Sequence, residues 1–183
     1  MKRRITFNSP AVLTFALISA AVLIINTVTG GAMNRYFSIY RTSFTDPWMY
    51  LRLFTHVLGH ADVSHYANNM MLFLVLGPML EEKYGSRMLV EIMAVVAVVT
   101  GLLHIFLFPR TALMGASGIV FAFILLASVT GSGKGIPVTL IIVALIYISQ
   151  QIWSGVTVHD NISQLTHIAG GLVGMGYGML LKK

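Results

Sequence analysis

The feature that most constrains this chain is a series of six long apolar stretches separated by polar segments. They cover approximately residues 11–29, 65–80, 88–108, 115–130, 136–153 and 165–181. A helix that crosses a bilayer needs about 20 mostly apolar residues, and each stretch approaches that length. Overall, 56% of the chain is hydrophobic and 10% is charged, which is more apolar surface than one soluble core could bury. We therefore predict an all-α polytopic membrane protein with six transmembrane helices.

The positions of lysine and arginine predict its orientation. With a cytoplasmic N-terminus, eight of the twelve basic residues fall in cytoplasmic segments and four in external ones, as the positive-inside rule requires. Six crossings then place both termini in the cytoplasm. The first apolar stretch is too long for a typical signal peptide, so we interpret it as a retained span. The absence of a transit segment favours the plasma (inner) membrane of a prokaryote.

Charge and composition also exclude some functions. The formal net charge of +6 is spread over short segments, so the chain offers no basic face for nucleic acid. It contains no cysteine, and therefore neither disulfides nor a thiolate metal site.

We predict a single domain over residues 1–183, with a first loop at residues 30–64 that is too long for a plain connector. Its many aromatic residues suit a membrane interface, and we expect a partly helical hairpin in the outer leaflet. An ordinary external loop is the alternative.

The first candidate functional residue is Ser117, which lies between glycines at the outer start of the fourth stretch. Pro109 ends the preceding helix, so a new helix begins near Ser117. Backbone N–H groups without intrahelical partners and the positive end of the helix dipole would surround this serine, which suits a developing oxyanion. A helix cap or a small-residue helix contact is the alternative interpretation.

The second candidate is His167 in the sixth stretch. Gly170, Gly174 and Gly178 recur every four residues and form one bare stripe, which allows another helix to approach closely. The fourth stretch is a good partner, because it carries small residues at its outer end. Such packing would bring Ser117 and His167 within hydrogen-bonding reach and activate the serine. A histidine that only makes an interhelical hydrogen bond is the alternative.

A third group lies near the start of the second stretch. His65 and Asn69 share one helix face at i and i+4, and both can donate hydrogen bonds to an oxyanion. His56 and His60 precede them and resemble half of a metal site. We do not predict a metal or other cofactor, since the His-Glu-x-x-His pattern of zinc proteases is absent.

We expect structural roles for four further polar residues. We expect Glu81 and Glu82 at the cytoplasmic interface, paired with nearby basic groups. Glu91 would either reach that interface or pair with Arg87, and His104 would pack in the core.

In order and spacing these motifs resemble the rhomboid family of intramembrane serine proteases, from Trp48 to Gly178. The matching pieces are the loop run from Arg52 through His56 and His60, then His65 and Asn69, the Gly-x-Ser-Gly at Ser117, and the His-x-x-Gly-x-x-x-Gly that begins at His167. Each piece is weak by itself, but four in the right order on a six-span frame are a specific match. The residue before Arg52 is often tryptophan in the family and is Leu51 here, and Phe121 stands where tyrosine is common.

The resemblance implies peptide hydrolysis by a Ser117–His167 dyad without an aspartate. His65, Asn69 and the backbone N–H of Ser117 would stabilise the oxyanion. Active-site support would come from Gly115, Gly118, Phe121 and His60. The partners would be the lipid bilayer and transmembrane protein substrates whose helices unwind near the outer interface. An inactive rhomboid-like protein that binds membrane helices is the main alternative, and a small transporter is a weaker one, because inverted repeats are not apparent.

Overall fold

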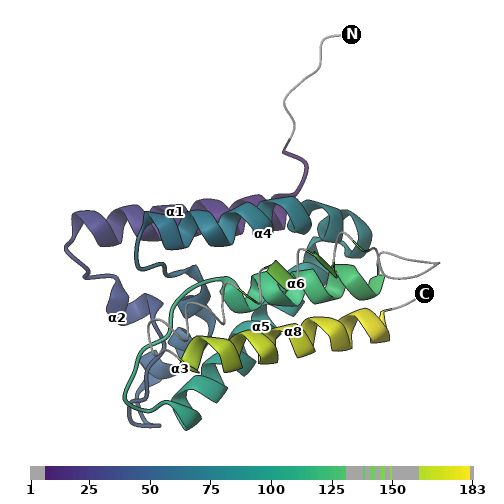
Figure 1. The fold of residues 1–183 in the computed structure, drawn as a ribbon. Helices are drawn as coiled ribbons and strands as arrows, with labels where there is room; N and C mark the ends of the chain where they lie inside the picture. The colour runs from purple at the N-terminus through teal and green to yellow at the C-terminus, as the bar shows by residue number, and fades with distance from the viewer. Residues whose placement is uncertain are drawn as a thin grey trace.

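The computed structural model describes residues 7–130, 138, 141–142, 145–146, 149 and 161–181, and this part of the chain is predominantly helical (Figure 1). The elements are α1 (Pro10–Val28), α2 (Asn34–Phe37), α3 (Pro47–Thr55), the 3₁₀ helix η1 (His56–Leu58), α4 (Val63–Tyr84), α5 (Ser86–Leu107), α6 (Ser117–Thr130) and α8 (Asn161–Leu180). The predicted span at residues 136–153 lies mostly outside the described residues. Within the described residues there is no strand, only an isolated β-bridge, so the all-α class is confirmed.

Five of the six predicted spans coincide with described helices. Two of them, α1 and α5, are long and apolar enough to cross a membrane by themselves. The apolar part of α6 is shorter, and α4 carries several polar residues, among them His65 and Asn69. The six-span arrangement therefore remains a prediction, supported most directly by α1 and α5.

The helix boundaries follow from local chemistry. Asp62 caps α4 by accepting a hydrogen bond from the backbone N–H of His65 at 2.8 Å, and Asp46 caps α3 in the same way. Proline occupies the first turn of both α1 and α3, where its missing N–H costs nothing. Gly85 separates α4 from α5 with φ of +82°, a conformation that favours glycine. Gly85 therefore forms the turn between α4 and α5.

Interlocking aromatic rings hold the helices together. Phe73 of α4 contacts Phe15 of α1 with ring centroids 4.8 Å apart and stacks on Phe123 of α6 at 5.2 Å. Phe73 and Phe123 are fully buried. In Figure 1, α1 lies alongside α4 and α8 lies alongside α6, and the contacts agree. The core therefore runs from α1 through α4 and α6 to α8.

The predicted first loop contains α2, α3 and η1, organised around a buried arginine. Arg52 is 3% exposed and its guanidinium makes a 2.9 Å salt bridge to Asp46, a 3.0 Å hydrogen bond to Thr42 and a cation–π contact with Tyr40. The hydrogen bond from Arg52 holds the pKa of Asp46 below its usual value. The partly helical character was expected; placement in the outer leaflet stays a prediction.

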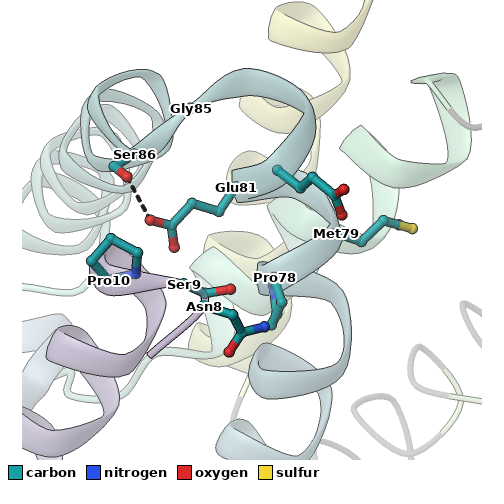
Figure 2. A pocket seen from close by; sticks show the side chains of 9 residues that line it. Asn8, Ser9, Pro10, Pro78, Met79, Glu81, Gly85 and Ser86 are labelled. Atoms are coloured by element: carbon teal, nitrogen blue, oxygen red, sulfur yellow. Dashed lines mark hydrogen bonds between the residues drawn. The ribbon is translucent and has the colours of Figure 1, made fainter. Parts of the chain in front are cut away.

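The structure corrects the expectation for Glu81. Among the described residues its carboxylate pairs with no basic group; it accepts hydrogen bonds from the backbone N–H groups of Ala11 at 2.9 Å and Val12 at 3.0 Å, and from the Ser86 hydroxyl at 2.6 Å (Figure 2). Glu81 thus caps the N-terminus of α1 from another helix, where the helix dipole favours negative charge. Sequence spacing could not reveal this, because the partners lie 69 and 70 residues away.

Glu81→Gln should therefore destabilise the protein in detergent. The amide has one acceptor oxygen instead of two and no charge, so one N–H group of α1 loses its partner, with a cost on the order of 2 kcal/mol. Thermal unfolding followed by tryptophan fluorescence would measure it. Glu82→Gln is the matched control, because Glu82 is exposed; equal melting temperatures for the two variants would contradict the capping role.

Two other expectations can be compared with the structure. Glu91 accepts a hydrogen bond from the Tyr177 hydroxyl of α8 at 3.2 Å, a partner different from the suggested Arg87. His104 is buried, as expected, and its Nε2 lies 3.0 Å from the Thr111 carbonyl oxygen.

Candidate active site

Ser117 is the first residue of α6, and the segment before it is held in place by the first loop. Leu113 forms a two-bond antiparallel bridge with Ile39, with N···O distances of 2.8 and 2.9 Å. The backbone N–H of Gly115 donates to the carbonyl of His56 at 3.0 Å. Gly115 has φ of +127°, which a residue with a side chain rarely adopts. These contacts fix the turn from which Ser117 begins its helix.

Ser117 meets His167 across two helices. The serine Oγ lies 2.6 Å from His167 Nε2, although the residues are 50 positions apart. His167 is 5% exposed. With Nε2 as the acceptor, the serine hydroxyl donates its proton along this contact, which is the arrangement of a nucleophile and its general base.

The glycines of α8 explain how the two side chains come so close. A Cβ on Gly170 would lie 2.5 Å from the carbonyl oxygen of Gly118, and one on Gly174 would lie 2.2 Å from that of Ala122. Both are backbone atoms of α6, so α8 rests directly on the main chain of α6. Gly178 is also buried. This close approach places His167 beside the start of α6, as the glycine spacing predicted.

His65 and Asn69 lie on the other side of the same turn. A Cβ on Gly115 would come within 2.7 Å of His65 Nε2 and 3.7 Å of Asn69 Nδ2. Asn69 is 3% exposed, and its Nδ2 has no partner among the described residues. The N–H of Ala61 donates weakly to His65 Nδ1, at 3.5 Å, which leaves the proton on Nε2. Two hydrogen-bond donors therefore face the segment that leads into Ser117.

His56 and His60 pack behind this group. His56 Nδ1 lies 3.0 Å from the carbonyl of Arg52, and its Nε2 lies 3.4 Å from the Thr100 hydroxyl. The His60 ring stands edge-on to His65 and Tyr66, at 5.1 and 5.3 Å. Within the described ranges, no group of three potential ligands is placed to hold a metal ion. Both ring nitrogens of His56 have partners, whereas His60 Nε2 has none among the described residues.

These two histidines predict a loss of stability in mild acid. Burial lowers the pKa of each, to about 4, whereas an unfolded histidine titrates near 6.5. Between about pH 6.5 and 4 the unfolded chain binds protons that the folded chain does not, so stability should fall with pH by on the order of 1 kcal/mol per unit for each histidine. Melting temperatures in detergent between pH 7 and 4.5 would show this, and His60→Gln should flatten the slope. A melting temperature constant over this range would refute it. The lowered pKa of Asp46 affects stability only at more acidic pH, where that carboxylate becomes protonated.

Some contributors were not identified from the sequence. The methyl group of Thr100 would lie 3.2 Å from a Cβ on Gly118, so Thr100 of α5 packs against the residue after Ser117. Thr100 could have been noticed in the sequence, because it is a polar residue within an apolar span. The Ile39–Leu113 bridge had no such signal, because both residues look like ordinary apolar positions. Phe121 lies against Gly171 of α8.

Ser117 and His167 thus form a serine–histidine pair near the starts of α6 and α8, with the donors of His65 and Asn69 nearby. A family model described as Rhomboid domain matches residues 47–183, and the chain belongs to the rhomboid family. A search of curated proteins gave no significant match. The rhomboid domain and the apolar helices indicate an integral membrane protein, either an intramembrane protease or a non-proteolytic rhomboid-like protein.

Proposed function

We propose that this protein is an intramembrane serine endopeptidase that cleaves transmembrane segments of membrane-anchored proteins. The observation that carries the proposal is the 2.6 Å contact between Ser117 Oγ and His167 Nε2. Non-proteolytic members of such a family have no need to keep a hydroxyl and an imidazole in this geometry. Ser117 would act as the nucleophile and His167 as the general base.

The reaction would run in two stages. Ser117 Oγ attacks the scissile carbonyl carbon while His167 Nε2 takes the hydroxyl proton, and the proton then passes to the leaving amine. The acyl-enzyme is hydrolysed by a water molecule that His167 deprotonates in turn. In both stages the negative oxygen would be stabilised by His65 Nε2–H, Asn69 Nδ2–H and the backbone N–H of Ser117. The unpartnered, buried Nδ2 of Asn69 supports this role, since an orphan donor is costly unless a ligand uses it.

The location of the site supports a particular orientation. Ser117, His65 and His167 lie at or near the starts of α6, α4 and α8, at the end opposite to Glu81. The distribution of lysine and arginine predicts that this end lies at the outer membrane face. We therefore propose that the site faces outward and that both termini are cytoplasmic. The substrates would then be proteins whose helices unwind near the outer interface. We also propose that the chain forms a single domain.

Labelling of the detergent-purified protein with a fluorophosphonate tests the proposal without knowledge of the substrate. The probe should modify Ser117, as located by mass spectrometry of the labelled peptide, and heat-denatured protein should not react. EDTA should leave the labelling rate unchanged, because no group of three potential metal ligands is found among the described residues. Folded protein that fails to label would instead support the non-proteolytic, helix-binding alternative.

A further inference from the structure

The turn that begins α4 holds His65 by both its backbone and its ring. Asp62 stands at the N-cap position, and one of its carboxylate oxygens accepts the backbone N–H of His65 at 2.8 Å. The His65 ring reaches back in the other direction, where its Nδ1 accepts the backbone N–H of Ala61 at 3.5 Å. Two consecutive residues, Ala61 and Asp62, therefore contact the same histidine at two different places.

This arrangement is a variant of the capping box. In a capping box the N-cap side chain accepts the N–H of the third helical residue, and a Glu or Gln side chain at that third position returns to the backbone N–H of the N-cap residue. Here the third residue of α4 is His65, and its ring returns to Ala61, the residue before the cap. The cap therefore bears on the ring of a proposed oxyanion donor as well as on the start of the helix.

The contact with Ala61 determines which nitrogen of His65 can donate. A neutral imidazole has one N–H and one acceptor nitrogen. Because Nδ1 accepts from Ala61, the proton lies on Nε2. This nitrogen faces Gly115, since a Cβ on Gly115 would lie 2.7 Å from it, and Gly115 leads into Ser117. The ring thus presents its N–H group to the segment where the proposed oxyanion develops.

Packing from α1 limits the remaining freedom of the His65 ring. The buried ring of His60 stands nearly edge-on to it, with centroids 5.1 Å apart and an interplanar angle of 68°. His60 also packs on Tyr66 at 5.3 Å, and the Tyr66 hydroxyl donates to the Ala16 carbonyl of α1 at 3.1 Å. The His65 ring is therefore held between a wall connected to α1 and the turn formed by Ala61 and Asp62.

We propose that Asp62 is a positioning residue for the reaction, which holds His65 so that its Nε2–H meets the oxyanion. This inference rests on the proposed serine-protease function. Asp62 acts through His65 and does not contact the substrate. Without the carboxylate, the turn at Ala61 is no longer tied to the His65 backbone. The ring then loses its Nδ1 partner and populates the other tautomer, in which Nε2 accepts instead of donating. The loss falls on the transition state and spares substrate binding.

Asp62→Gly is the main test, because glycine is an acceptable N-cap residue but has no side-chain acceptor. Asp62 is exposed, so the change opens no cavity. In proteoliposomes with a single-span reporter protein, Asp62→Gly should lower kcat by about 10- to 100-fold and change KM by less than about twofold. Asp62→Asn and Asp62→Ser also supply an acceptor at the N-cap, so their kcat should stay within about threefold of the wild type.

A double-mutant cycle separates this role from a general effect on folding. If Asp62 acts through His65, Asp62→Gly should cause no further loss of kcat in a His65→Ala background. Glu81→Gln is the matched background at the other end of α4, and there Asp62→Gly should cause its full loss. Equal losses in both backgrounds, or an unchanged kcat in Asp62→Gly, would overturn the proposal.

Nitrogen-15 NMR of histidine-labelled protein tests the same positioning without a measurement of activity. The ring signals of His65 are assigned by their absence in His65→Ala. They should show the Nε2–H tautomer in the wild type and a mixture of tautomers in Asp62→Gly; the same single tautomer in both proteins would contradict the role of Asp62. A folded wild type that neither cleaves the reporter nor reacts with the fluorophosphonate would count against the proposed function instead, and the NMR comparison would still decide whether Asp62 positions His65.

Discussion

Ser117→Ala should reduce cleavage of a single-span reporter protein in proteoliposomes to the background rate. The change removes only the hydroxyl group, whose oxygen lies 2.6 Å from His167 Nε2. The nucleophile is therefore lost while the helix start is kept. His167→Ala should lower the rate by at least about 10³-fold, because the serine then has no base. The free energy of unfolding of Ser117→Ala should stay within about 1 kcal/mol of the wild type, because only one oxygen is lost. His167→Ala should be less stable, because it removes a buried ring.

A variant of an oxyanion donor provides the graded comparison. Asn69→Ala should lower kcat by about 10²- to 10³-fold with little change in KM, because its Nδ2 donor would act on the developing oxyanion and not on the bound substrate. If Ser117→Ala cleaved at the wild-type rate, Ser117 would not be the nucleophile. Cleavage lost equally in an exposed-surface variant such as Met71→Ala would point to misfolding instead.

Gly174→Ala should disrupt folding and activity together. The added methyl group would lie 2.2 Å from the Ala122 carbonyl oxygen and 2.7 Å from its Cα, and these are backbone atoms that cannot rotate away. Helix α8 must therefore move off α6, at a cost of about 3 kcal/mol. Gly170→Ala should act similarly, since its Cβ would lie 2.5 Å from the Gly118 carbonyl oxygen, and leucine at either position should be more severe.

Gly176→Ala is the matched control on the same helix. A Cβ there meets nothing within 4 Å, so alanine should be neutral or stabilising by up to about 1 kcal/mol through its higher helix propensity. Melting temperature and the rate of fluorophosphonate labelling would be measured for all three alanine variants. If Gly174→Ala labels and melts like Gly176→Ala, close packing of α8 on α6 is not what holds His167 beside Ser117.

Much of the candidate site could be predicted because its residues lie in patterns that local rules interpret. A serine after a proline-terminated helix predicts a helix start, and the glycines at every fourth position of α8 predict a close helix contact. His65 and Asn69 share a helix face by spacing alone. The spans at α1 and α5 follow from length and hydropathy, and the predicted span at residues 136–153 lies mostly outside the described residues.

Other features depended on contacts between distant parts of the chain. Glu81 was expected to pair with basic residues, but among the described residues its carboxylate accepts hydrogen bonds from the N–H groups of Ala11 and Val12 and from Ser86, because the start of a helix can also satisfy a carboxylate. Likewise the Ile39–Leu113 bridge and the bond from Gly115 to the His56 carbonyl use backbone groups, which every residue possesses and no sequence pattern marks.

The sequence by itself determined that the chain is helical, apolar enough for lipid and equipped with a serine, two histidines and an asparagine near helix starts. Periodicity and hydropathy act within a few turns of helix, so they specify which residues share a face. Only the tertiary structure decided which faces meet: α8 against the backbone of α6, the first loop against the segment before Ser117, and Glu81 against α1. These pairings depend on shape and on unsatisfied backbone groups tens of residues apart, and they bring Ser117 to 2.6 Å from His167.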